Sequence, residues 1–455
     1  MKTKLFTVIF AFLACVGTMS ADIVKVQIGD LYYWLNSEDK TAEVRFSYQY
    51  LELSTANIPS SVTYDNVTYS VTSIGRMAFY KLDSLTSVTI PNSVTSIGES
   101  AFSMCPNLTS IDIPNSVISI GKYAFRRDSS LSILRIPNSI TIIEDETFSA
   151  CTSLTAIKIP NSVTSIGKYA FAWCSGLTSM TIPNSVISIG DGAFSTCTSL
   201  TNVTIGTSVT SINFDAFKGC SSLPIQNNIR YADTYLVEAV DKSLSTYTIK
   251  EGTKWIGSFA FCNCVDLTSI EIPHSITSIG YGAFAADSSL ISIEIPTSVT
   301  SIEIGAFQSC VNLTSIDIPN SVTSIGGFAF SYCSGLTSVT IPNSVTSLRY
   351  HTFDGCTGLL SVTCFAVTPP ELADEIFYNV DCSQIPLYVP EESIDLYKAA
   401  AQWQEFNPIS PIKNVEGITD VNTSTTHRSS KNLRNGQILI LRGDKVYTLQ
   451  GQEVK

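Results

Sequence analysis

The stretch Leu85-Thr-Ser-Val88-Thr-Ile90-Pro91-Asn92-Ser93-Val94-Thr-Ser-Ile97-Gly98, followed by Ala101-Phe102 and Cys105, returns along most of the chain in one register. Equivalent residues lie 23 apart within each of two runs. The phenylalanine marks these runs: Phe79, Phe102, Phe125, Phe148, Phe171, Phe194 and Phe217, then Phe261, Phe284, Phe307, Phe330 and Phe353. A fixed period of roughly 20–29 residues with leucine-rich strands is typical of a leucine-rich-repeat solenoid. Such a fold offers a long surface, which favours a binding function.

Within one repeat the apolar residues are spaced to share a single core. Leu85, Val88 and Ile90 lie among Thr and Ser residues, which predicts a short strand with its apolar side chains turned inward. Pro91 ends this strand because proline has no N–H to give to a ladder of strands. The later apolar positions are expected in the same core: Val94, Ile97, Phe102 and Cys105.

The repeat is degenerate once. Leu223 and Leu244 occupy the same strand position but lie 21 residues apart. The unit 224–246 replaces the Ala-Phe turn with the segment 227–236, in which we expect a hairpin that projects from the stack without interrupting it. Two interpretations stay open, tolerated drift in one unit and a dedicated contact site.

The two ends of the chain depart from the repeat. Strand-like runs on either side of Gly29-Asp30 predict a hairpin that caps the first repeat, and a helix is expected near Glu391 to Trp403. The predicted segments are a signal peptide (1–21), an N-terminal cap (22–70), the solenoid (71–363), a C-terminal cap (364–412), a linker (413–435) and a short β-rich tail (436–455).

The first residues have the features of a secretory leader. Lys2 and Lys4 precede a short apolar run, and Met19-Ser20-Ala21 offers a small-residue cleavage site. The run is too short to span a bilayer, and no other stretch is expected to do so. Cys15 is a candidate for lipid anchoring, but free secretion or surface display after cleavage is the favoured interpretation.

Composition limits the class of partner. The formal net charge is −12 and charged residues make up 15% of the chain. An acidic protein without clustered cations is a poor candidate for binding nucleic acid or an anionic membrane.

Most of the 13 cysteines occupy one register position, three residues after the phenylalanine. Side chains at equivalent positions of a stack point the same way, which is poor geometry for a disulfide. We therefore expect reduced, buried thiols at these ladder cysteines: Cys105, Cys151, Cys174, Cys197, Cys220, Cys264, Cys310, Cys333 and Cys356. Cys364 and Cys382 lie outside the ladder and could pair.

The motif Ile90-Pro-Asn-Ser-Val-Thr-Ser-Ile-Gly98, with Ala101-Phe102 and Cys105, closely resembles the BspA-like leucine-rich repeats of bacterial surface proteins. The resemblance covers about 57–363. It implies a cell-surface protein that adheres to host matrix or to other cells. The last residues, 443–455, resemble the final strands of the C-terminal sorting domains of type IX secretion, which implies a sorting signal.

No catalytic constellation stands out in the sequence. The three histidines, His274, His351 and His427, show no pair with metal-ligand spacing, so neither a metal site nor a cofactor is expected. Phosphate-binding loops and nucleophile elbows are missing from the sequence. We therefore predict that the protein is not an enzyme.

Candidate binding residues come from the exposed strand position between Val88 and Ile90. In equivalent repeats it holds Arg135 and Lys158 in the first half, and Glu271, Glu294 and Asp317 in the second. Either these charges are random solubilising substitutions or they form a polarised recognition face. Aromatic residues also occupy variable corners, and among them Trp173 is the candidate for contact with carbohydrate.

The sequence thus predicts a secreted or surface-displayed binding protein, an adhesin that contacts an extracellular protein. The alternative is a carbohydrate-binding surface protein that captures nutrients.

Overall fold

The structure is a computed structural model that describes residues 23–412 and, within the tail, the backbone of 431–434, 437–442, 445–448 and 453–454. The predicted signal peptide, lipid anchoring at Cys15 and most of the predicted linker lie outside the described residues. The chain divides into two units, Met1–Pro411 and Ile412–Lys455.

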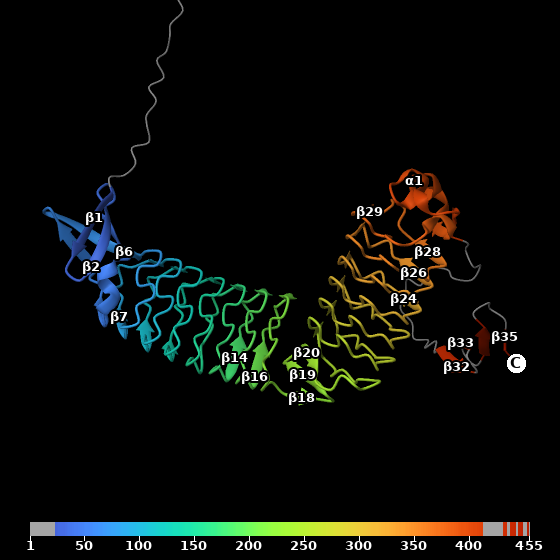
Figure 1. Ribbon diagram of the computed structural model, residues 1–455, viewed down its shortest axis with the longest axis horizontal. Helices are drawn as coiled ribbons and strands as arrows, with labels where there is room; N and C mark the ends of the chain where they lie inside the picture. Colours follow the sequence, from blue (N-terminus) through green and yellow to red (C-terminus); the bar gives the residue numbers. More distant parts are fainter. Residues whose placement is uncertain (1–22, 413–430, 435–436, 443–444, 449–452, 455) are drawn as a thin grey trace, which may run out of the picture. The chain divides into compact units, whose positions relative to one another are not determined.

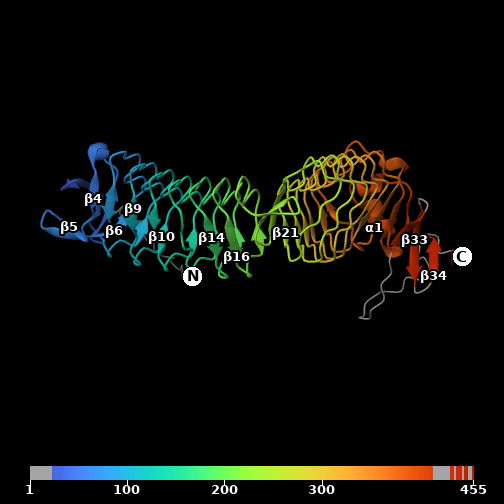
Figure 2. The ribbon, with the colours of Figure 1, turned by 90° about the horizontal axis from the view of Figure 1, so that it is seen from below.

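The first unit is a parallel β-solenoid with turns of about 23 residues, as the spacing predicts (Figures 1 and 2). The leucine-containing part of each repeat builds what we call the first strand column. Leu85, Val88 and Ile90 are buried there while Thr86 and Thr89 are exposed, which confirms the predicted inward face. The strands of this column are β4 (Thr55–Asn57), β7 (Ser87–Thr89), β9 (Ser110–Asp112), β11 (Ile133–Leu134), β14 (Ser179–Ile182), β16 (Asn202–Ile205), β24 (Ser315–Asp317), β26 (Ser338–Ile341) and β28 (Ser361–Cys364).

A second strand column follows the Pro-Asn-Ser turn and was not expected from the sequence. Its strands are only two residues long, and most of them pair in parallel with the equivalent strand of the next repeat, as Ile97 does with Ile120. They are β8 (Ser96–Ile97), β10 (Ser119–Ile120), β12 (Ile142–Ile143), β13 (Ser165–Ile166), β15 (Ser188–Ile189), β17 (Ser211–Ile212), β21 (Trp255–Ile256), β22 (Ser278–Ile279), β23 (Ser301–Ile302), β25 (Ser324–Ile325), β27 (Ser347–Leu348) and β29 (Glu371–Leu372).

The phenylalanines stack face to face through the core of the solenoid. Ring centroids of successive residues from Phe79 to Phe217 lie 5.2–5.6 Å apart with nearly parallel planes. The run from Phe261 to Phe353 repeats this geometry at 5.1–5.5 Å. Backbone bonds join the same turns, since the N–H of Phe102 donates to the carbonyl of Ala124 at 2.8 Å. The 23-residue spacing therefore places identical groups in contact.

The N-terminal strands lead directly into the stack. Strands β1 (Ile23–Ile28), β2 (Leu31–Asn36) and β3 (Thr41–Arg45) form an antiparallel meander. β3 then pairs in parallel with β6 (Val67–Ile74), which also pairs with β5 (Ser61–Tyr64) and with β8 of the second column. Tyr50, in the 3-10 helix η1 (Tyr48–Glu52), stacks on Phe79 at 5.8 Å. Solenoid packing thus begins inside the predicted cap.

The degenerate unit does form a hairpin, but the prediction that it projects is wrong. Strands β18 (Ile225–Gln226), β19 (Ile229–Ala232) and β20 (Tyr235–Ala239) are antiparallel, and all four residues of β19 are buried. β20 pairs in parallel with β21, so the hairpin is built into the second strand column. Arg230 is buried with it because its guanidinium contacts Glu238 at 2.9 Å and the carbonyl of Leu223 at 3.0 Å.

The stack continues beyond Cys364, where the sequence pattern lapses. β28 pairs with β30 (Leu387–Val389), which pairs with β31 (Ile409–Pro411), all in parallel. Phe377 extends the ring stack at 5.6 Å from Phe353. The predicted helix is short, α1 (Ile394–Ala399), flanked by the 3-10 turns η3 (Glu391–Ser393) and η4 (Trp403–Glu405); a third, η2, spans Cys382–Gln384.

Two further expectations at this end need correction. Cys364 and Cys382 are free buried thiols and not a disulfide, and the Cys364 sulfur accepts a hydrogen bond from the Tyr397 hydroxyl at 3.1 Å. The second unit is an antiparallel sheet of β32 (Lys431–Arg434), β33 (Gln437–Arg442), β34 (Lys445–Thr448) and β35 (Glu453–Val454). Its first strand lies within the segment predicted as linker.

Candidate functional site

The first strand column carries a row of exposed side chains at the register of Thr89, which we call the exposed row. Parallel pairing places members of successive repeats side by side, as in Thr89 with Asp112 and Asp317 with Thr340. Thr248 and Glu271 form an isolated parallel bridge in the same register. Where the strands pair, the row therefore brings one residue of each repeat beside its equivalent in the next.

Glu271, Glu294 and Asp317 are consecutive members of the exposed row, and we call them the acidic stripe. All three are exposed, while the residues on either side of them in sequence are buried. A shallow hollow of about 480 Å³ lies over part of this stripe and is lined by Glu251, Glu271 and Glu294 together with His274. Like charges on neighbouring strands repel, so this arrangement costs folding free energy.

The cations of the exposed row lie in the other half of the solenoid. Leu134 pairs with Ile111, so the next residue, Arg135, lies beside Asp112 in the row. Lys158 follows one repeat later, where the chain has no assigned strand. Both side chains are exposed. The structure thus keeps the predicted cationic and acidic segments apart along one row.

Trp173 lies at a corner of its repeat, away from the strand residues. Its side chain is 44% exposed, and its ring stacks on Tyr169 at 5.8 Å with an interplanar angle of 20°. A flat apolar surface held in place by a second ring can stack on a partner's ring or on the apolar face of a sugar.

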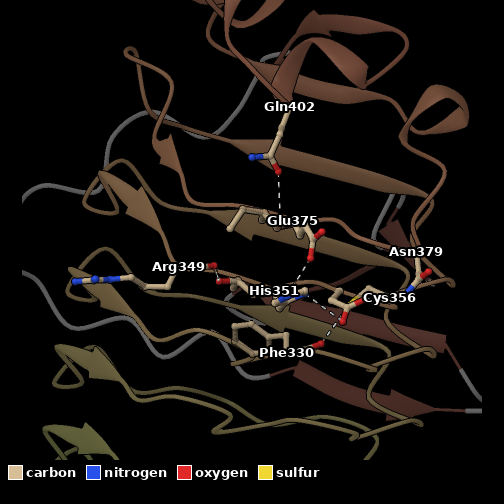
Figure 3. Close-up of polar contacts among 10 residues, drawn as sticks. Phe330, Arg349, His351, Cys356, Glu375, Asn379 and Gln402 are labelled. Atoms are coloured by element: carbon tan, nitrogen blue, oxygen red, sulfur yellow. Dashed lines mark hydrogen bonds and ion pairs between the residues drawn. The ribbon is translucent and has the colours of Figure 1, made fainter.

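His351 lies where the last repeats meet the C-terminal segment (Figure 3). Its ring stacks on Phe328 at 4.9 Å, and Nε2 lies 3.2 Å from Oε2 of Glu375. Nδ1 lies 3.4 Å from Asp354, whose other carboxylate oxygen accepts a hydrogen bond from Asn379 at 3.2 Å. Even so, no group of three or more His, Cys, Asp or Glu residues is arranged to hold a metal ion among the described side chains. The cluster serves to join the two segments.

The corner three residues before each phenylalanine holds ion pairs that sequence reasoning missed. We call this line the corner column. In the first half its charges alternate, and they pair as Arg76 with Glu99 at 3.4 Å, Lys122 with Asp145 at 2.7 Å, and Lys168 with Asp191 at 2.8 Å. Such exposed pairs each contribute little to stability. The pattern was available in the sequence, because these residues lie 23 apart and alternate in sign.

The sequence matches the BspA type leucine rich repeat region in six copies, over residues 45–176, 141–240 and 238–360. The chain belongs to this family. No protein of curated function matches it. Among solved structures, a leucine rich cell surface protein from Faecalibacterium prausnitzii is 32% identical, with a TM-score of 0.46, and the match covers 78% of this chain and 96% of that one. A leucine-rich repeat protein from Bacteroides ovatus is 26% identical, with a TM-score of 0.39, and the match covers 85% and 100%.

In this BspA-type solenoid each ladder cysteine is a free thiol whose sulfur atom takes part in a hydrogen bond. The sulfur of Cys174, for example, donates to the carbonyl of Phe148 at 3.1 Å, and burial raises the pKa of this thiol to about 12. Cys264 is the exception, since its sulfur instead accepts from the Tyr247 hydroxyl at 3.5 Å. All nine ladder cysteines are free. Protonated thiols of this kind are poor nucleophiles and poor metal ligands.

The described residues also contain no helix with the length and hydropathy needed to cross a membrane.

Proposed function

We propose that the protein is a secreted or surface-displayed adhesin without catalytic activity, which contacts an extracellular protein through the exposed row. The observation that supports this proposal is the parallel register of the first strand column, which places Thr89 beside Asp112, Asp317 beside Thr340 and Thr248 beside Glu271. A partner with a complementary row of charges could contact several repeats at once. The family's association with bacterial cell surfaces supports the proposed location, with the leader at 1–21 as the export signal.

The acidic stripe is the proposed centre of this contact. Glu294 has a carboxylate neighbour on both sides in the row, at Glu271 and Asp317, and other repeats carry threonine at this position. A chain that did not use these charges could carry threonine here as well, without the repulsion. The partner is therefore expected to be basic at the contact, and host matrix or another cell is its proposed source. Arg135 and Lys158 would contact acidic residues of the same partner.

Binding to immobilised matrix glycoproteins and to cells tests the adhesin function. Purified protein is expected to bind at least one of them more strongly than an unrelated acidic solenoid, and binding should weaken as salt concentration rises. Glu294→Thr should reduce this binding. Asp266→Asn is the matched control, because Asp266 is exposed but lies in a turn outside the row. Equal binding by all variants at all salt concentrations would exclude the stripe as the contact.

A second candidate function is carbohydrate binding, favoured by the exposed Trp173 ring stacked on Tyr169. Glycan-array signal that is lost in Trp173→Ala would support it. Tyr332→Ala is the control, since Tyr332 is another corner aromatic with 49% exposure. A signal that both variants lose, or that neither loses, would argue against a site at Trp173.

A further inference from the structure

A second hollow, of about 420 Å³, opens where the second strand column is interrupted by the degenerate unit. β17 is the last strand of one sheet, and the next sheet begins with the hairpin β18–β20, so β17 has no strand partner on that side. Ile212 is only partly buried at this point, whereas its equivalent Ile189 is fully buried. The side chains that matter below are Asp191, Asn213, Phe214, Tyr281 and Glu303.

Several residues around this hollow differ from the residue that most repeats carry at the same position. Most repeats have glycine four residues before the phenylalanine, because a Cβ there would meet the backbone of the preceding repeat; at Gly280 the nearest atom would be the carbonyl oxygen of Ile256 at 2.7 Å. The exceptions are Glu144, Asn213, Glu303 and Arg349. Asn213 and Glu303 both line the hollow. The charged corner column likewise ends here, with Phe214 and Tyr281 in its register.

Three aromatic rings meet at the interruption. Phe214, Phe259 and Tyr281 lie edge to face, with centroids 5.1–5.9 Å apart. Phe214 and Tyr281 each remain 37% exposed and border the hollow. The rings therefore join the two halves of the stack and still present apolar surface to a ligand.

Both charged residues that line the hollow are acidic. Its lining includes Asp191 and Glu303 and neither lysine nor arginine. Asp191 is partly neutralised by Lys168 at 2.8 Å, whereas Glu303 makes no ion pair with any described residue. Rings of the same region already attract cations of the chain itself, since Lys218 lies 5.3 Å from the Phe259 centroid and Lys254 lies 5.7 Å from that of Trp255. Across the described residues, no such cation lies over Phe214 or Tyr281.

We propose that this hollow receives an arginine side chain of the partner protein. Its guanidinium would pair with the Glu303 carboxylate while its plane stacks on the exposed ring of Phe214, which stands edge to face with Tyr281. A planar, weakly hydrated cation suits this combination better than the compact ammonium of lysine, because it can stack on a ring and bond a carboxylate at once. The proposal rests on the proposed role as a protein-binding surface and names the chemistry of one contact. It is independent of the exposed row.

A short capped peptide with one arginine and otherwise uncharged residues is the probe, and the same peptide with citrulline is its neutral isostere. Titration calorimetry with the full-length protein should show saturable binding of the arginine peptide. Glu303→Gln and Phe214→Leu should each weaken it by about fivefold or more. Phe214→Leu keeps an apolar side chain at the interruption but removes the ring, and thermal unfolding will show that both variants are folded. Asp266→Asn, which removes an exposed carboxylate outside both the hollow and the exposed row, should leave the affinity unchanged.

Any of four results would overturn the proposal: no saturable binding at about 20 mM peptide, equal binding of the citrulline peptide, an equal loss in Asp266→Asn, or binding of neutral saccharides in the hollow with no binding of arginine. The first three concern only this contact, since the adhesin function is read from Glu294→Thr with matrix or cells. Adhesion that depends on Glu294 but not on Glu303 would leave the proposed function standing without this contact. Arginine binding without adhesion would support this contact and contradict the proposed adhesin function.

Discussion

The carboxyl group of Asp287 lies against the backbone of Cys264, one repeat earlier, and accepts a hydrogen bond from its N–H at 2.9 Å. Asp287 stands at the register of the ladder cysteines and is fully buried, and its second oxygen has no hydrogen-bond partner. Burial raises the pKa of Asp287 to about 8, although the bond from Cys264 lowers it. Asp128 has the same relationship with Cys105 at 2.8 Å, and burial raises its pKa as well.

Replacing Asp287 should therefore flatten the pH dependence of stability. Because its folded pKa lies above the ordinary value near ~3.9, the stabilising contribution is complete below that value and is lost as the pH rises through about 8. Between pH 5 and 8 the free energy of unfolding should fall with a slope of up to about 1.4 kcal/mol per pH unit from this group. Asp287→Cys removes the carboxyl group. The Cys264 N–H still has a hydrogen-bond acceptor in this variant, because it also donates to the Phe261 carbonyl at 2.9 Å.

Urea unfolding followed at several pH values measures this slope. Asp287→Cys should gain stability relative to the unaltered protein as the pH rises toward 8. The control Asp317→Asn alters an exposed carboxylate and should keep the original slope. Parallel profiles for all three proteins would show that Asp287 does not hold a proton in the folded state.

The ladder cysteines should remain reduced and unreactive in the folded protein. Burial raises the thiol pKa of Cys174 and of Cys356 to about 12, so almost no thiolate forms at these two residues near neutral pH. Thiol titration of the unreduced protein in denaturant should detect the nine ladder thiols as free, whereas the native protein should react mainly at the partly exposed Cys262. Cys262→Ser is the control that removes this fast reaction. Finding most of the nine oxidised within the chain would contradict the stacked arrangement.

The 23-residue period is why so much of the fold could be predicted. It determines which residues are neighbours in space, so the pairing of Thr248 with Glu271 follows from counting. The second strand column could not be predicted in the same way, because a strand such as Ser96–Ile97 is too short to show alternation. The burial of β19 was also hidden, since its polar Arg230 is buried only because Glu238 and the Leu223 carbonyl satisfy it.

The candidate sites also differ in how far the 23-residue period predicts them. Register alone predicts that Glu271, Glu294 and Asp317 share one row. The hollow beside Glu303 lies instead where the 23-residue period is interrupted. The sequence shows that the degenerate unit replaces a regular repeat there, but it does not show which surfaces that unit covers. The ring centroids of Phe214 and Tyr281 lie 5.1 Å apart although the degenerate unit stands between their repeats in sequence, and the 23-residue period does not predict this contact.

The phenylalanine stack should dominate the stability of each repeat. Phe307 is fully buried, and its ring lies 5.3 Å from Phe284 and 5.4 Å from Phe330. Phe307→Ala should lower the free energy of unfolding by about 3–5 kcal/mol, because it leaves a cavity and interrupts the stack on both sides. The measurement is urea unfolding, and Tyr332→Ala, at an exposed corner, should cost far less. A similar small loss for both variants would show that the neighbouring rings collapse into the cavity.

Relief of repulsion in the acidic stripe should be measurable without any partner. Glu294 lies between two carboxylates of the exposed row, so Glu294→Thr should raise the free energy of unfolding by about 0.2–1 kcal/mol at low salt. Added salt screens charges at this spacing, so the gain should shrink as ionic strength rises. Asp112→Thr is the matched control, because Asp112 lies in the same row between Thr89 and Arg135 and has no like-charged neighbour there. Its replacement should bring no gain, and thermal unfolding at low and high salt compares the two. If Glu294→Thr is no more stable than Asp112→Thr at low salt, the three carboxylates do not repel one another. Their retention would then need no partner to explain it.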